Sequence, residues 1–92
     1  MFKTEDELLR HFEDGGCMLD TVSGDVYISD VNLDGEFFGI FVTGPIPSED
    51  MGTIDDAVQA AYYYPMEEYC APGCWFSELA ERVIANPSMF LA

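Results

Sequence analysis

Carboxylates are the side chains of this sequence that could take part in the most kinds of chemistry. Asp and Glu make up 18 of the 92 residues, against three Lys and Arg, and the formal net charge is −15 at pH 7. Such groups can bind metal ions, transfer protons or accept charge-assisted hydrogen bonds from Lys and Arg. The net charge exceeds the value of about 2–8 that keeps a small domain soluble. A basic partner would explain the surplus, because net charge bears on association more than on fold.

A calcium loop is the first specific possibility. The run Asp30-Val31-Asn32-Leu33-Asp34-Gly35 matches the opening half of an EF-hand loop. The position that needs a bidentate Glu is Phe41, and oxygen ligands are too few for calcium. An Asn/Asp-Gly hairpin turn explains the same residues. We interpret the run as a turn and leave open whether it binds a cation.

A zinc site is the second possibility, built from Cys17, Cys70, Cys74 and His11. Three residues separate Cys70 from Cys74, and the other two candidates lie far away in the sequence. An odd number of Cys in a non-secreted chain also argues against a disulfide framework. We therefore expect no metal and no cofactor. A disulfide between Cys70 and Cys74 across the intervening Pro-Gly turn stays open.

Catalytic motifs are missing from the sequence. It has one His and no nucleophile elbow, phosphate-binding loop or metalloprotease signature. Acids are so frequent that two of them close together carry no information about general acid–base chemistry. We predict that the protein is not an enzyme and has no catalytic residue.

Tyrosines bunch around the expected second helix and its exit. Tyr62, Tyr63 and Tyr64 are consecutive, so they cannot all point into a core. An exposed Tyr beside acids suits an interface that binds Arg or Lys. We choose Tyr63 as the aromatic candidate for partner binding.

The elements that position these side chains follow from capping and periodicity. With 49% hydrophobic and 14% aromatic residues, the chain is a folded single domain over residues 1–92 and not an acidic disordered tail. Thr4 to Glu7 fits a capping box, and Leu8, Leu9 and Phe12 give a helical stripe. Helices are expected over 5–14, from Thr53 to about 62 and over 75–85, and strands over 17–22, 25–31 and 36–43.

The predicted fold class is α+β. We expect an N-terminal helix, a three-stranded antiparallel β-meander and two C-terminal helices packed on the sheet, in the order α-β-β-β-α-α, with helices over one face. Residues 66–69 are expected to add a turn of helix, and the apolar residues 89–91 to dock on the body.

Neither a membrane nor free nucleic acid suits this chain as a partner. No apolar run approaches the roughly 20 residues that cross a bilayer. The acidic start of the chain lacks the basic and apolar regions of a signal peptide. An acidic surface is also repelled by anionic lipid and by nucleic acid. We predict a cytoplasmic protein that is a monomer and binds neither.

The size, the charge, the compact α+β pattern and paired acids such as Asp55-Asp56 and Glu67-Glu68 resemble a class of phage proteins. These are the small acidic inhibitors that act as nucleic-acid mimics, including type I anti-CRISPR and anti-restriction proteins. The likeness covers the whole chain but no shared motif, so it transfers no residue role. It implies stoichiometric binding, without catalysis, to a basic groove of a host defence complex in the infected bacterium.

The leading hypothesis is an anionic inhibitor that mimics DNA and blocks target DNA binding by a basic partner, a CRISPR effector complex or a nuclease. It expects the carboxylates to gather on one rigid face. The proposed contacts lie at turns and helix ends: Asp25, Asp30, Asp34, Glu36, Asp55, Asp56, Glu67 and Glu68, with Tyr63. The alternative is a non-mimic module, such as an immunity or antitoxin-like protein, that neutralises a basic nuclease through an aromatic hot spot.

Overall fold

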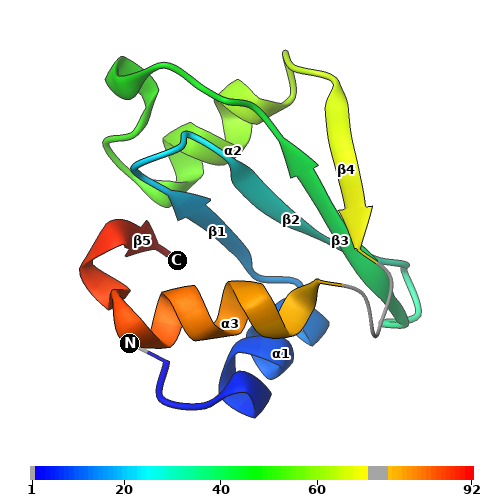
Figure 1. The fold of residues 1–92 in the computed structure, drawn as a ribbon. Coiled ribbons are helices and arrows are strands. Elements are labelled where there is room, and N and C mark those ends of the chain that lie inside the picture. The colour runs from blue at the N-terminus through cyan, green and yellow to red at the C-terminus, as the bar shows by residue number, and fades with distance from the viewer. Residues whose placement is uncertain (1, 71–74) are drawn as a thin grey trace.

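A computed structural model describes residues 2–70 and 75–92 of the chain. The chain forms one antiparallel sheet with helices on both of its faces (Figure 1). Its elements are α1 (Glu5–Glu13), β1 (Cys17–Asp20), β2 (Val26–Val31), β3 (Phe37–Thr43), η1 (Ser48–Asp50), α2 (Ile54–Ala61), β4 (Met66–Cys70), α3 (Phe76–Ala85), η2 (Pro87–Met89) and β5 (Phe90–Leu91).

The sheet has five strands in the order β4-β3-β2-β1-β5, and every neighbouring pair is antiparallel. Short turns join β1 to β2 and β2 to β3, as antiparallel neighbours allow. β4 and β5 are the two edges. β5 pairs Leu91 with Leu19 of β1, which brings the end of the chain next to its first strand.

Two apolar clusters hold the helices to the sheet. On one face, here called the α1–α3 face, Leu8 and Phe12 of α1 and Val83 of α3 pack with Tyr27 and Ile40 of the strands. On the other, the α2 face, Ala57 and Ala61 of α2 pack against Leu19 and Val26. Burying apolar area on both faces supplies most of the drive to fold.

The helix starts expected at Thr4 and Thr53 are confirmed. Thr4 Oγ1 accepts a hydrogen bond from the Glu7 amide at 3.1 Å, and Thr53 Oγ1 accepts one from the Asp56 amide at 3.1 Å. Each cap satisfies an amide that the helix leaves without a partner. Acids follow in both first turns, where the helix dipole favours them.

The predicted order α-β-β-β-α-α and its three-stranded meander are wrong. The order is α-β-β-β-α-β-α, followed by the short β5. Residues 66–69, expected as a turn of helix, belong to β4 and pair with β3, with Tyr69 opposite Phe41. Strand preference depends on cross-strand neighbours, so pairing overrides the helical character of a Met-Glu-Glu run.

The expectation that helices cover only one face of the sheet is also wrong. α1 and α3 cover one face and α2 the other (Figure 1). The reason is that β1 and β2 are apolar on both sides. Met18 and Tyr27 face α1 and α3, whereas Leu19 and Val26 face α2.

Candidate functional site

The carboxylates lie almost entirely at the surface, where the described residues offer them no cationic partner. Residues 2–70 and 75–92 include every acidic and basic side chain, and within them Asp20–Arg82 is the one ion pair. Every carboxylate other than Asp20 is exposed or half-buried. The surface can therefore accept hydrogen bonds from many Lys or Arg side chains of another molecule.

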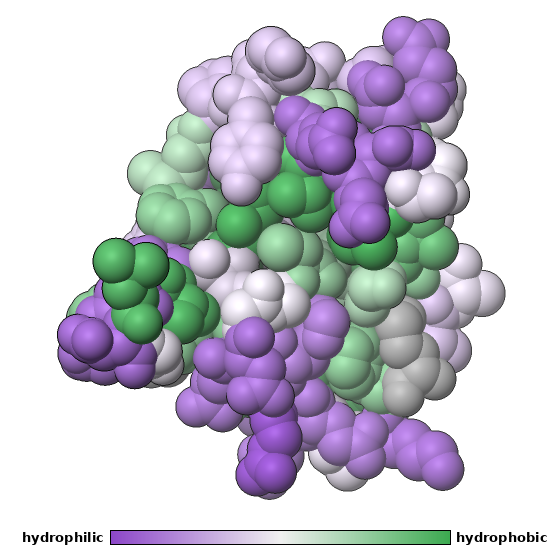
Figure 2. Space-filling view, turned by 180° about the vertical axis from the view of Figure 1, so that it is seen from behind, coloured by the Kyte–Doolittle hydropathy of each residue, from purple (hydrophilic) through white to green (hydrophobic). Residues whose placement is uncertain are grey.

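These carboxylates surround the molecule. α1 and α3 carry acids on one side of the sheet, and η1 and α2 carry them on the other. Figure 2 views the molecule from behind and shows hydrophilic groups above and below a band of hydrophobic and near-neutral surface. The acids thus do not form the single face that the mimic hypothesis expects.

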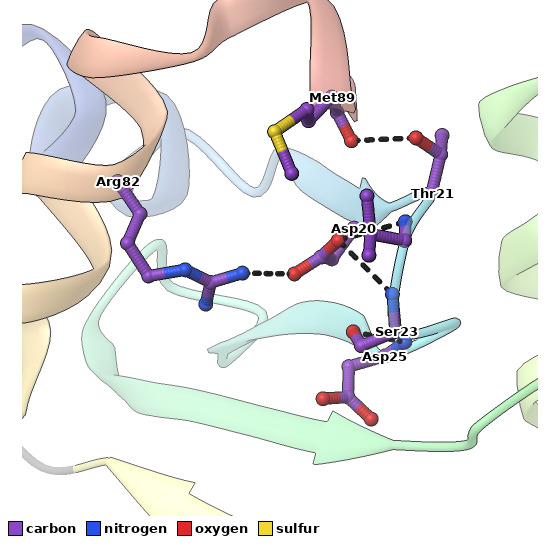
Figure 3. A network of polar contacts seen from close by, with 7 residues as sticks. Asp20, Thr21, Ser23, Asp25, Arg82 and Met89 are labelled. Carbon is purple, nitrogen blue, oxygen red and sulfur yellow. Dashed lines mark hydrogen bonds and ion pairs between the residues drawn. The ribbon is translucent and has the colours of Figure 1, made fainter.

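Asp20 is the exception, because its side chain is only 1% exposed. It accepts hydrogen bonds from the amides of Val22 at 2.9 Å and Ser23 at 3.2 Å, and it pairs with the Arg82 guanidinium (Figure 3). Burial acts to raise the pKa of Asp20, but the guanidinium and the two amides outweigh it, and the pKa lies below its ordinary value.

The same contacts fasten the C-terminal segment. The Arg82 guanidinium lies over the Phe90 ring at 5.4 Å, and the Thr21 hydroxyl donates to the Met89 carbonyl at 2.7 Å. This buried acid joins α3, the turn after β1 and the chain end. It serves the fold and is unavailable to a partner.

An acidic hollow lies between η1 and α2, with a volume of about 380 Å³. It brings together two of the predicted site residues, Asp56 and Tyr63. It also contains two acids that the sequence did not single out, Glu49 and Asp50. Its complete lining is Glu49, Asp50, Asp56, Gln59, Ala60, Tyr63 and Tyr64. Tyr63 is 90% exposed, so its ring is free to meet a partner.

A second predicted pair, Asp25 and Glu68, lines a hollow of about 300 Å³ on the α1–α3 face. Glu78 of α3 joins them, as does Arg82. Glu67 is exposed on β4 without a described side-chain partner. The sheet thus separates this group from the acidic hollow, because the two open on opposite faces.

Asp34 and Glu36 occupy the turn between β2 and β3. Their amides donate to Asn32 Oδ1 at 3.0 and 2.8 Å, and Asn32 Nδ2 donates to the Glu36 carboxylate at 3.3 Å. The side chain of Asn32 therefore organises the turn, as Asn does in Asx turns. Among the residues that the structure describes, no group of three or more His, Cys, Asp and Glu side chains could hold a metal.

Asp30 lies apart from that turn and contacts β4. Tyr69 Oη donates to Asp30 Oδ2 at 2.9 Å, and the Tyr69 ring packs edge-on against Phe41 at 5.1 Å. Partial desolvation raises the pKa of Tyr69, and the bond to Asp30 raises it further. Gly39 permits this arrangement, since a Cβ there would lie 2.7 Å from the Tyr69 hydroxyl.

His11 and Cys17 are the remaining polar candidates. His11 Nε2 lies 2.8 Å from the Cys17 carbonyl. Burial raises the pKa of the Cys17 thiol, and the nearby Asp55 carboxylate raises it too, so the reactive thiolate is disfavoured. The Cys70–Cys74 disulfide that the sequence leaves open involves Cys74, which lies outside the described residues.

An apolar groove of about 370 Å³ is the feature that sequence reasoning missed. Its lining comes from β2, β3, the end of α2 and β4: Ile28, Ser29, Phe41, Thr43, Ala61, Tyr62, Tyr64 and Met66. We call it the tyrosine groove. The alternation of Phe41 and Thr43 along β3 was a usable signal. Because residue 66 was expected to be helical, the part of the groove that β4 contributes could not be predicted.

Comparison of the chain with protein-family models, with curated proteins and with solved structures gave no match. None of the helices in the described part of the chain has the length and hydropathy needed to cross a membrane. The function is therefore inferred from the chain's own residues.

The Asp20–Arg82 pair yields a first prediction. Arg82→Gln leaves a buried carboxylate with only its two amide donors, so we expect the free energy of unfolding to fall by about 1–3 kcal/mol. Urea unfolding at pH 7 measures it. Arg10→Gln is the matched control. Arg10 is exposed on α1, so its replacement should change the free energy of unfolding by no more than about 0.5 kcal/mol. Equal losses in both variants would contradict a structural role for the pair.

The lowered pKa of Asp20 yields a second prediction. Protonation favours the unfolded chain, where the carboxyl has its ordinary pKa of about 3.9. The contribution of the ionised Asp20 is therefore present above that value and is lost as pH falls through the lower, folded-state pKa. The difference in free energy of unfolding between the wild type and Asp20→Asn should be largest near neutral pH. It should shrink as the pH falls below about 4. A gap that stays constant down to pH 2 would contradict this account.

The unpaired surface charge yields a third prediction. Because like charges repel in the folded state, added NaCl should raise the melting temperature. A gain of about 1 kcal/mol corresponds to about 4–8 °C for a domain of this size. The rise should be steepest at low salt, because the Debye length falls from about 30 Å at 0.01 M to about 8 Å at 0.15 M. A melting temperature that falls with NaCl would show that attractive ion pairs dominate instead.

Proposed function

We propose that this protein is a non-catalytic anionic inhibitor that occupies a basic, nucleic-acid-binding surface of another protein and blocks it. One observation carries the proposal: within residues 2–70 and 75–92 the surface carboxylates have no cationic partner, since the one ion pair found there uses the buried Asp20. A surface in this state gains most from a partner rich in Lys and Arg.

A nucleic-acid-binding surface is the partner chemistry that fits best. Duplex DNA carries one negative charge per about 1.7 Å of its axis, and proteins hold it with Lys and Arg. Exposed carboxylates compete for those same side chains. The charge also accelerates encounter with a basic surface at low ionic strength. Because the acids surround this protein, it can engage a groove whose walls contact more than one of its sides.

The resemblance to phage-encoded acidic inhibitors suggests which partner to test first. A CRISPR effector complex of the bacterial cytoplasm has the required basic channel. On this proposal the protein binds as a monomer and prevents target DNA from entering. It binds neither nucleic acid nor membrane itself.

A second candidate function is supported by a separate observation. Tyr63, which is 90% exposed, lines the acidic hollow, and Tyr62, which is 75% exposed, lines the adjoining tyrosine groove. Exposed tyrosines next to acids are typical of interface hot spots. An immunity-like protein that neutralises a basic nuclease through these rings would bind with less dependence on salt, because aromatic contacts are not screened.

Charge reversal tests the proposal. The variant Asp55→Lys/Asp56→Lys alters the first turn of α2, and Glu5→Lys/Asp6→Lys is the control, with the same change of charge in the first turn of α1. We expect the first variant to weaken binding to a type I effector complex by at least about tenfold, or about 1.4 kcal/mol. The control should weaken it less. Calorimetry measures affinity, and a DNA gel-shift assay measures inhibition.

Salt dependence decides between the two candidates. For an anionic inhibitor of a nucleic-acid site, affinity should fall steeply between about 50 and 200 mM salt. If binding persists at high salt and only Tyr62→Ser/Tyr63→Ser abolishes it, the aromatic hot spot is the better account. If neither the effector complex nor a basic nuclease binds the wild type, the proposed function is wrong.

A further inference from the structure

We propose that the tyrosine groove and the adjoining acidic hollow together bind one segment of the partner, a cationic amphipathic segment that places an apolar side chain in the groove and a Lys or Arg in the hollow. The inference rests on the proposed function and deepens it by naming the docking surface and the chemistry of its occupant.

The groove is a part of the sheet that its helix leaves uncovered. α2 is eight residues long and packs mainly against β1 and β2. Beyond its end, the α2 face of β3 and β4 opens to solvent between Phe41, Met66 and the tyrosines that follow α2. Met66 is 54% exposed there. A hydrophobic hollow at the surface is a usual mark of a binding site.

Thr43 gives an independent sign that the groove has an occupant. Thr43 lines the groove and is only 8% exposed, and its Oγ1 has no hydrogen-bond partner among the described residues. Buried hydroxyls are nearly always satisfied. Because Oγ1 is itself buried, a peptide group lying in the groove would supply the missing bond once the Thr43 side chain rotates its hydroxyl toward the groove.

The charges beside the groove are all negative. Asp30 lies at one end, two residues after Ile28 on the same face of β2, and holds the Tyr69 hydroxyl. The acidic hollow lies on the other side of Tyr64, a residue that lines both hollows. Arg10 and Arg82 belong to α1 and α3, on the opposite face of the sheet.

This combination selects the occupant. A purely apolar segment would leave the carboxylates unused, and a second copy of this chain would bring another net charge of −15 next to them. A cationic amphipathic segment satisfies both hollows at once. Its apolar side chain removes Phe41 and Met66 from water, and its Lys or Arg meets the carboxylates and can lie over a tyrosine ring.

Three fluorescent peptides of equal length test the proposal with the full chain. One alternates Leu and Arg, the second has Ser in place of Leu, and the third has citrulline in place of Arg. We expect the Leu–Arg peptide to bind at least about tenfold more tightly than either of the others. In ¹⁵N-labelled protein, amide shift changes should concentrate at the groove and hollow, including Phe41, Thr43, Tyr64 and Met66.

Two variants with controls keep the test interpretable. Tyr62→Ser changes an exposed groove side chain and should leave folding intact, and Val22→Ser is its control, an exposed apolar side chain away from both hollows. Glu49→Gln/Asp56→Asn removes two of the three carboxylates of the hollow, and Glu5→Gln/Asp6→Asn makes the same change of charge on α1. Each site variant should lower the affinity for the Leu–Arg peptide at least about fivefold more than its control does.

Equal effects in variants and controls would overturn the inference, as would shift changes spread over α1 and α3. Failure of the function looks different. If Asp55→Lys/Asp56→Lys abolishes binding to the effector complex while Tyr62→Ser retains it, the function stands and the groove inference fails. If the peptide results hold but no basic nucleic-acid-binding protein binds, the groove stands and the proposed function fails.

Discussion

The buried pair of Asp20 and Arg82 is the contact on which the arrangement of this small fold depends. A carboxylate without a compensating charge is expensive to bury, and this chain has only three cations for 18 acids. One of the three lies against Asp20. The pair joins α3 to the turn after β1, and the Thr21–Met89 hydrogen bond places β5 at the sheet edge beside it. The packing of α3 on the α1–α3 face therefore requires that the Asp20 carboxylate be buried.

Using a cation inside the fold has a consequence outside it. Lys3 and Arg10 are the remaining cations, and both belong to the region of α1. The α2 face, with its acidic hollow and tyrosine groove, has no cation of its own among the described residues. Two apolar clusters offset the repulsion between surface acids, and they do so by filling the space next to the helices. What they leave uncovered is the strip of sheet beyond the end of α2.

Local chemistry made much of this fold predictable. Thr4 and Thr53 cap helices in sequence-readable ways, and the apolar run in β3 indicates a central strand. β4 was not predictable, because Met66 and the two Glu after it favour helices and only pairing with β3 makes them a strand. Asp20 was missed because Asp is usually exposed. The signal available was its place before Ser23-Gly24, where a carboxylate accepts turn amides.

The uncovered groove and the excess of carboxylates constrain each other. On a neutral protein, an apolar groove next to the exposed edge strand β4 would favour self-association. Here Glu67 and Glu68 lie on that edge, and a second copy brings the same charges to it. On the proposed function, repulsion between copies leaves the groove open, while the same field draws in cationic chains. In that proposal the acids disfavour a second copy and attract a cationic segment, and the groove adds the short-range contact that charge alone does not provide. That division of labour reconciles acids on every side of the molecule with a preference for one docking surface.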